Sequence, residues 1–318
     1  MGCERAAAFD RERPDDASLA HVRGTDECGN LPVMNVPLLV STEWLAGRRG
    51  DPGVRIADVR WSLLERHRGR DAYRQAHIPG AVYLDVDDDL ASPRGQGPGR
   101  HPLPRPEPFA ASMSRAGIGA ATHVVAHDFG DGSTAARLWW LLRYFGHGRV
   151  SLLDGGIARW VAEGRRLEAD VPAYPPGAFA AEANAAMRVD ADDVERLRTD
   201  PRALLLDSRM PERYEGRVEP IDPVAGHVPG ARNRPYPANV RSAEDPRFRA
   251  AAELRGQFVE LGADRAERVV AYCGSGVNAC QNLFALALAG FEDGLLYEGS
   301  WSDWCSTGAR AIGIGSEP

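Results

Sequence analysis

The sequence predicts an α/β protein with two tandem domains, each a mainly parallel sheet with helices on both faces. Short apolar segments alternate with helix-like segments, the same pattern occurs twice, and 318 residues are enough for two full cores. Strands that alternate with helices are typical of a parallel sheet, because parallel strands need a crossover connection. We expect a disordered leader over 1–35, a first domain over 36–163, a linker over 164–187 and a second domain over 188–318.

The elements of the first domain follow from short apolar runs and their punctuation. Ser41 is a suitable helix cap, and Pro and Gly mark a turn at 77–81. The segment 91–108 is rich in Pro, Gly and Arg, which predicts a long surface loop. The expected strands are 54–59, 82–85, 123–127 and 150–153, and the expected helices are 41–46, 109–116 and 135–145.

The second domain repeats the first after roughly 150 residues. Three pairs of segments carry the repeat: 58–60 with 207–209, 77–81 with 227–231, and 123–128 with 268–273. The repeat aligns Asp128 with Cys273, so only the second domain has a cysteine at this position. We therefore expect an inactive first domain and a catalytic second one.

The charge and the apolar pattern exclude several classes of partner. A net charge of −7 and a pI of about 5.7 argue against binding to nucleic acid or anionic membranes. The longest apolar stretch, 283–290, is far shorter than the roughly 20 residues of a membrane span. Charged residues interrupt the N-terminus, so it lacks the apolar core of a signal peptide.

The five cysteines do not suggest a disulfide framework, because their number is odd and the chain is long. The expected compartment is therefore the cytoplasm. No cluster with metal-ligand spacing is visible, so we expect neither a metal nor an organic cofactor.

Cys273 has the strongest signal for chemistry. It follows an apolar run that predicts a buried strand, and it precedes a glycine-containing loop and a helix over 279–290. The glycines allow the backbone N–H groups to converge on one point, and the helix adds the positive end of its dipole. Such a site favours the thiolate, which is the nucleophilic form, and could hold a second anion beside it.

The loop over 273–278 resembles the active-site loop of the rhodanese family, and more closely that of the mercaptopyruvate sulfurtransferases. Those enzymes have Cys-Gly-Ser-Gly-Val-Thr, and this chain matches five of the six positions, with Asn278 in place of Thr. Thiosulfate-preferring members have basic residues where this chain has Gly274 and Ser275. The resemblance covers residues 36–312 and implies two tandem rhodanese-like domains.

The resemblance implies a role for each matching residue. Cys273 is the expected nucleophile, Ser275 relays a proton, and Arg213 binds the anionic end of the donor. His77 and Asp71 match a histidine and an aspartate of the family that are proposed to complete the relay across the domain cleft. A purely structural role also explains His77, because its turn recurs at 227–231. The expected binding loop is completed by Gly274, Gly276, Val277 and Asn278.

The implied reaction is a two-step sulfur transfer. The Cys273 thiolate takes sulfur from a small anionic donor, and a thiophilic acceptor (cyanide, a small thiol or a protein thiol) removes it. The loop favours 3-mercaptopyruvate as donor. Asp222 stands where the mercaptopyruvate enzymes have a second carboxylate-binding arginine, which keeps a thiosulfate-preferring rhodanese as an alternative.

Two rivals belong to other classes. A cysteine phosphatase has an arginine six residues after its cysteine, and here that residue is Ala279. The other rival is a non-catalytic rhodanese-like sensor or scaffold, which the combination of Cys273, Ser275 and Arg213 disfavours. Cys280, on the expected helix, is interpreted as a packing residue rather than a resolving thiol.

Overall fold

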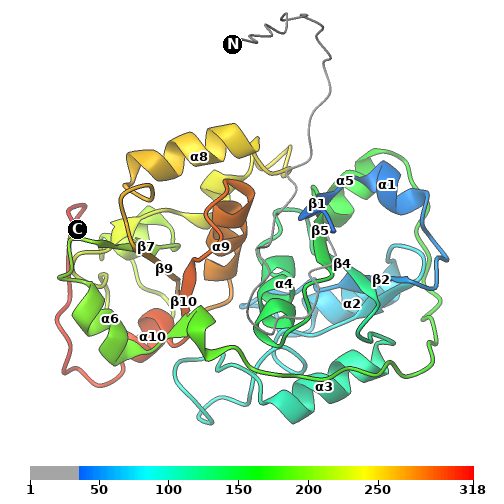
Figure 1. Cartoon of the computed structure of the whole chain (residues 1–318), viewed down its shortest axis with the longest axis horizontal. Helices are drawn as coiled ribbons and strands as arrows, with labels where there is room; N and C mark the ends of the chain where they lie inside the picture. Colours follow the sequence, from blue (N-terminus) through cyan, green and yellow to red (C-terminus); the bar gives the residue numbers. More distant parts are fainter. Residues whose placement is uncertain (1–35) are drawn as a thin grey trace, which may run out of the picture.

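The computed structural model describes residues 36–318, and these residues form two five-stranded sheets (Figure 1). The predicted leader over 1–35 lies outside the described residues. All pairings between neighbouring strands in both sheets are parallel, which confirms the predicted fold class. Each sheet has helices on both faces. No helix among residues 36–318 is long and apolar enough to span a membrane.

The two sheets have the same strand order, shifted by one repeat. The first sheet has the order β1-β5-β4-β2-β3 and the second β6-β10-β9-β7-β8. The strands of the first sheet are β1 (Leu39–Val40), β2 (Val54–Asp58), β3 (Ala81–Tyr83), β4 (His123–His127) and β5 (Val150–Leu153). Those of the second are β6 (Arg188–Val189), β7 (Ala203–Asp207), β8 (Arg232–Asn233), β9 (Arg268–Tyr272) and β10 (Leu295–Tyr297).

Helices connect the strands in both domains. Those of the first domain are α1 (Thr42–Ala46), α2 (Arg68–Gln75), α3 (Pro106–Arg115), α4 (Ala135–Tyr144) and α5 (Gly156–Ala162). The others are α6 (Ala191–Leu197), α7 (Pro211–Tyr214), α8 (Ala251–Glu260), α9 (Ala279–Leu288) and α10 (Ser300–Trp304), with short 3-10 helices at η1 (Ala185–Met187) and η2 (Tyr236–Asn239). The expected helices in the first domain are present, whereas α2 was not predicted, because its mainly polar sequence has few apolar residues to mark a period.

Side chains alternate between the two faces of each sheet. In β9, Val269 and Ala271 join one buried cluster, whereas Val270 and Tyr272 join another. The first of these clusters also contains side chains of α3 and α4 from the first domain. The inner faces of both sheets therefore share one hydrophobic core that runs across the domain boundary.

Helices α4 and α9 carry this shared core and lie in the middle of the molecule (Figure 1). The rings of Trp139 on α4 and Phe284 on α9 pack edge to face with centroids 5.0 Å apart. Helix α4 follows the loop after β4, and α9 follows the loop after β9, so the contact between the two helices brings these two loops to the domain interface. The site below lies there because the strand ends meet at this interface.

Candidate active site

Cys273 lies directly after β9 and is only 4% exposed. Its backbone N–H donates to Ser300 Oγ at 3.1 Å, and its carbonyl accepts from the Trp301 N–H at 3.0 Å. The Gly274 carbonyl accepts from the Ser302 N–H at 3.0 Å. Hydrogen bonds with the start of α10 therefore hold the backbone of this loop in place.

The N–H groups of the loop are oriented differently from its carbonyls. Gly276 has φ +78°, a left-handed conformation that favours glycine, and its carbonyl accepts from Arg137 and from the Cys280 thiol. Among the residues that the structure describes, none accepts a hydrogen bond from the N–H groups of 274–278. Asn278 begins α9, but its side chain makes no capping hydrogen bond. The loop thus keeps a set of donors for an anion.

The matching loop of the first domain contains its own anion. The Asp128 carboxylate accepts hydrogen bonds from four backbone N–H groups, at 2.9 to 3.1 Å; they belong to Gly130, Gly132, Thr134 and Ala135. A carboxylate at this position fills the cradle that the second domain leaves for a ligand. The repeat therefore supports the interpretation of the Cys273 loop as an anion-binding site.

A histidine from the first domain contacts the Cys273 loop. His101 Nδ1 lies 2.7 Å from Ser275 Oγ, and His101 Nε2 lies 3.2 Å from Asp87 Oδ1. Ser275 and His101 are each 6% exposed. A neutral imidazole with its proton on Nε2 donates to Asp87 and accepts from the Ser275 hydroxyl. The three side chains form one hydrogen-bonded chain across the domain interface, called the relay below because its geometry suits proton transfer.

Trp61 holds the far end of the relay. Its indole Nε1–H donates to Asp87 Oδ2 at 2.9 Å, and its ring packs edge to face against His101. The hydrogen bond from His101, together with the one from Trp61, lowers the pKa of Asp87 despite its partial burial. Asp87 therefore stays ionised and fixes the orientation of the imidazole.

The relay residues differ from the predicted His77 and Asp71. The structure does not bring His77 to Cys273: its ring is fully buried, stacks on Tyr73 at 4.0 Å, and its Nδ1 lies 2.8 Å from the Tyr73 carbonyl oxygen. His227 makes the same contacts with Tyr214 in the second domain. Because both copies of the turn use the histidine in this way, its role is structural.

Asp71 is also absent from the site. It lies in the first turn of α2, its side chain is 67% exposed, and its nearest cation is Arg74 at 3.9 Å. An aspartate in the first turn interacts favourably with the helix dipole, which accounts for its position. The structure therefore places Asp87 and His101 beside Ser275, and it does not place Asp71 or His77 there.

Arg213 and Arg100 point at the loop from opposite domains. An ideal Cβ built on Gly274 would lie 2.8 Å from Arg100 Nη2 and 3.4 Å from Arg213 Nη1. Neither of these two nitrogens has a hydrogen-bond partner among residues 36–318. Two guanidinium nitrogens with free hydrogens thus converge above Gly274, beside the nucleophile.

The other guanidinium N–H groups of these arginines bind carboxylates, except Arg100 Nε, which has no partner among the described residues. Arg213 binds Glu219 through a bidentate contact and reaches Asp222 at 3.0 Å. Arg100 pairs with Asp222 through Nη1. Asp222 occupies the position of the second arginine of the mercaptopyruvate enzymes, but it does not take over the role of that arginine itself. It holds Arg100, which comes from the other domain, over the same loop.

The close approach at Gly274 leads to a test of the arginine pair. In Gly274→Ala, the new methyl group would displace Arg100, so we expect KM for an anionic donor to rise about tenfold, the value of one charge-assisted hydrogen bond. The thermal midpoint should not fall, because the backbone of Gly274 is not left-handed. Steady-state kinetics measure the KM. Gly256→Ala, in open space on α8, is the matched control, and an equal change in both variants would contradict the expectation.

The two other cysteines of the second domain are buried. Cys280 is fully buried, its thiol donates to the Gly276 carbonyl at 3.3 Å, and burial raises the pKa of Cys280 to about 12. Cys305 packs against Trp301 and Trp304. Neither can attack a disulfide or a persulfide readily as a thiolate. The described residues include no group of three or more His, Cys, Asp or Glu side chains that could hold a metal.

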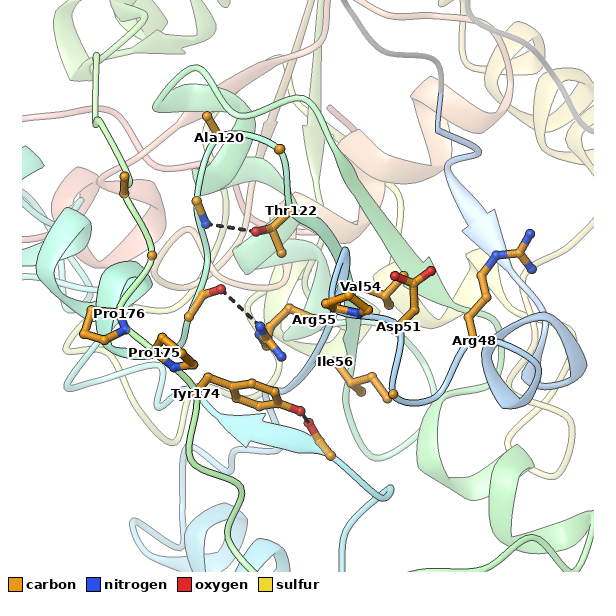
Figure 2. A pocket seen from close by; sticks show the side chains of 18 of the residues that line it. Arg48, Asp51, Val54, Arg55, Ile56, Ala120, Thr122, Tyr174, Pro175 and Pro176 are labelled. Atoms are coloured by element: carbon orange, nitrogen blue, oxygen red, sulfur yellow. Dashed lines mark hydrogen bonds between the residues drawn. The ribbon is translucent and has the colours of Figure 1, made fainter.

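A cavity of about 630 Å³ lies at the opposite end of the first sheet, where β2 and β4 begin (Figure 2). Its buried cation, Arg55, stacks on the ring of Tyr174 at 3.2 Å and donates to the Gly117 carbonyl at 3.3 Å (Figure 2). Tyr174 belongs to the segment between the two domains. These contacts attach that segment to the first domain, and no residue of the Cys273 loop lines the cavity.

A second cavity, of about 470 Å³, lies over the Asp128 loop of the first domain. It is lined by residues of both domains, including Trp61, Phe129, Asp131, Arg241 and Arg249. Trp61 lines this cavity and also contacts His101 and Asp87, but no relay residue lines it.

Four residues of the site were not predicted from the sequence: Asp87, Arg100, His101 and Arg137. Arg100, His101 and Arg137 have partners in the second domain that are more than 120 residues away along the chain, and Asp87 reaches the site only through His101, so no local spacing marks them. One signal was available: the loop over 91–108 contains a single histidine next to an arginine, and that loop is too long for a simple connection.

A family model for the rhodanese-like domain matches residues 41–163 and 190–307. The chain is 41% identical to a Pseudomonas aeruginosa protein named probable 3-mercaptopyruvate sulfurtransferase, over 89% of this chain and 100% of that one. It is 35% identical to the thiosulfate sulfurtransferase of Bos taurus, over 84% and 91%. The crystal structure of the 3-mercaptopyruvate sulfurtransferase SseA from Escherichia coli superposes with a TM-score of 0.73 at 34% identity, covering 83% of this chain and 99% of that one.

Proposed function

Because this chain belongs to the rhodanese family and is a tandem-domain sulfurtransferase, we propose that it transfers sulfur from 3-mercaptopyruvate through a persulfide on Cys273. The observation that carries the choice of donor is the Ser275–His101–Asp87 relay beside the nucleophile. Its members lie in both domains, so the first domain takes part in the reaction although it has Asp128 in place of a cysteine.

The donor binds through its carboxylate. Arg100 Nη2 and Arg213 Nη1 converge above Gly274 and act as the two arms of a carboxylate clamp. The clamp orients the donor sulfur toward Cys273, and each charge-assisted hydrogen bond contributes about 1.5–3 kcal/mol. A guanidinium suits this role because it is planar and permanently charged.

The first half-reaction forms the persulfide. The Cys273 thiolate attacks the donor sulfur, the sulfur–sulfur bond forms, and the carbon–sulfur bond breaks with its electron pair moving to the enolate of pyruvate. The proton that leaves the donor sulfur ends on the enolate carbon. Ser275 can donate and accept a proton at once, and His101 behind it accepts the positive charge while the transfer proceeds.

The second half-reaction regenerates the enzyme. The N–H groups of 274–278 stabilise the terminal sulfur of the persulfide until a thiophilic acceptor attacks it and the Cys273 thiolate leaves. Cyanide, a small thiol and a protein thiol are all suitable acceptors. We propose the cytoplasm as the compartment, since the nucleophile must return to the reduced thiolate after each turnover.

A direct test compares the two donors with cyanide as acceptor. We expect a higher kcat/KM for 3-mercaptopyruvate than for thiosulfate. Mass spectrometry after incubation with the donor alone should find one added sulfur atom on the Cys273 peptide. A higher kcat/KM for thiosulfate would overturn the donor preference, and the absence of a persulfide with either donor would overturn the proposed reaction.

The negative charge of Asp222 disfavours thiosulfate, the alternative donor. It places a negative charge beside Arg100 and Arg213, where it repels the dianion thiosulfate more than the monoanion 3-mercaptopyruvate. In Asp222→Asn we therefore expect the kcat/KM ratio of thiosulfate to 3-mercaptopyruvate to rise about tenfold, in steady-state assays. An unchanged ratio would show that the donor anion does not bind near this residue.

A further inference from the structure

Arg137, on α4 of the first domain, is fully buried and crosses the domain interface. Its Nη1 donates to the Gly276 carbonyl at 3.2 Å, and its Nη2 donates to the carbonyls of His101 at 3.2 Å and Leu90 at 3.3 Å. One guanidinium therefore holds the Cys273 loop of the second domain and the His101 segment of the first.

Arg137 is costly for the stability of the fold. Its acceptors are all neutral carbonyls, its Nε has no hydrogen-bond partner among the described residues, and no carboxylate oxygen of 36–318 lies within 4.0 Å. A buried cation with no ion pair within 4.0 Å carries a desolvation penalty that neutral carbonyls and the more distant Glu298 carboxylate offset only in part. Packing alone does not explain why such a residue is placed there.

The repeat provides a comparison within the same molecule. Gln281 is the third residue of α9, as Arg137 is of α4, and its Nε2 donates to the Asp131 carbonyl in the loop of the first domain at 2.7 Å. Each helix thus reaches into the loop of the other domain. Only the side chain that reaches the Cys273 loop is an arginine, and only this one also binds the segment with His101.

We propose that Arg137 is a positioning residue that fixes His101 against Ser275 and so sets the geometry of the proton relay. This inference rests on the proposed function. The Cys273 loop has its own supports in Ser300, Trp301 and Ser302, so it keeps its shape without Arg137. The His101 segment is also bound through the Arg100 N–H to Ser302 Oγ and through the Pro102 carbonyl to the Ser92 N–H, but Arg137 holds the carbonyl of His101 itself. A displacement of about 1 Å is enough to impair a relay strongly.

The test measures kcat for two donors in Arg137→Met and Arg137→Lys. We expect Arg137→Met to lower kcat for 3-mercaptopyruvate at least about tenfold, and kcat for thiosulfate by less than about threefold, because sulfite leaves without a proton. Arg137→Lys should restore part of the loss. In a Ser275→Ala background, Arg137→Lys should have no further effect on kcat for 3-mercaptopyruvate, because the relay is already broken.

Gln281→Met is the matched control. It removes the equivalent cross-domain side chain, so we expect a lower thermal midpoint but equal effects on both donors. The proposal is overturned if Arg137→Met lowers kcat for both donors by the same factor, or if Gln281→Met shows the same selectivity. If Arg137→Met does not fold, Arg137→Lys provides the test. A lysine ammonium cannot bind the Gly276 and His101 carbonyls together as the planar guanidinium does. An unchanged ratio of the kcat values for the two donors in Arg137→Lys then overturns the proposal.

Failure of this inference is distinct from failure of the proposed function. Persulfide formation on Cys273 in the unmutated protein, detected by mass spectrometry, tests the reaction itself. A protein that forms the persulfide but shows no donor selectivity in the Arg137 variants retains the reaction and loses only the positioning role.

Discussion

Cys273→Ser is expected to abolish sulfur transfer from both donors, with kcat reduced by at least about 10⁴-fold. A serine hydroxyl cannot form a persulfide, so the first half-reaction has no product on the enzyme. The fold should be unaffected, because Ser fits the space of Cys and the loop is held through backbone contacts with Ser300, Trp301 and Ser302. Cyanide-coupled kinetics and mass spectrometry of the donor-treated protein measure the outcome.

Cys280→Ser is the control for this variant. Cys280 is seven residues further along the chain, fully buried, and a serine can still donate to the Gly276 carbonyl. We expect this variant to keep its sulfur-transfer activity. Residual turnover in Cys273→Ser, or a folded and inactive Cys280→Ser, would show that the nucleophile is assigned wrongly.

The sequence was sufficient for the fold because the information is local. Apolar runs, their spacing and the internal repeat predicted both sheets and the helices α4 and α9. The Cys273 loop could be identified for the same reason, since a strand, a glycine-containing loop and a helix follow one another within about 20 residues. The polar helix α2 was missed because its few apolar residues do not mark a helical period.

The relay could not be predicted because it depends on the packing of the two domains. His101 and Ser275 are separated by 174 residues, and contacts between the two domains, such as those of Arg100 and Arg137, bring their segments together. His77 was predicted instead because it belongs to a recognisable motif. The same motif recurs at His227, where the histidine makes the same contact within its own domain, and this recurrence indicated a structural role.

The arginine pair illustrates how a missing residue in one domain can be supplied by the other. The sequence placed Asp222 where a carboxylate-binding arginine was expected, which counted against 3-mercaptopyruvate. In the structure, Arg100 of the first domain pairs with Asp222 and presents its second nitrogen above Gly274. The first domain thus provides the positive charge across the interface, and the sequence of the second domain alone does not predict it.

Disruption of the relay should separate the two donors. His101→Asn is expected to lower kcat for 3-mercaptopyruvate about 10²-fold, the usual contribution of a positioned acid or base, and Ser275→Ala should have a similar effect. The kcat for thiosulfate should stay within about threefold of the unmutated value, because sulfite is a stable leaving group that needs no proton. Single-turnover measurements of persulfide formation with each donor report the chemical step directly.

His77→Asn is the internal control for this separation. His77 is buried in the turn of the first domain and stacks on Tyr73, so its replacement should lower the thermal midpoint and affect both donors equally. His101 contacts Ser275 at 2.7 Å, so its replacement should act on the proton transfer. Equal losses for both donors in His101→Asn would exclude the relay, and a donor-selective loss in His77→Asn would return the histidine role to the residue that the sequence motif indicated.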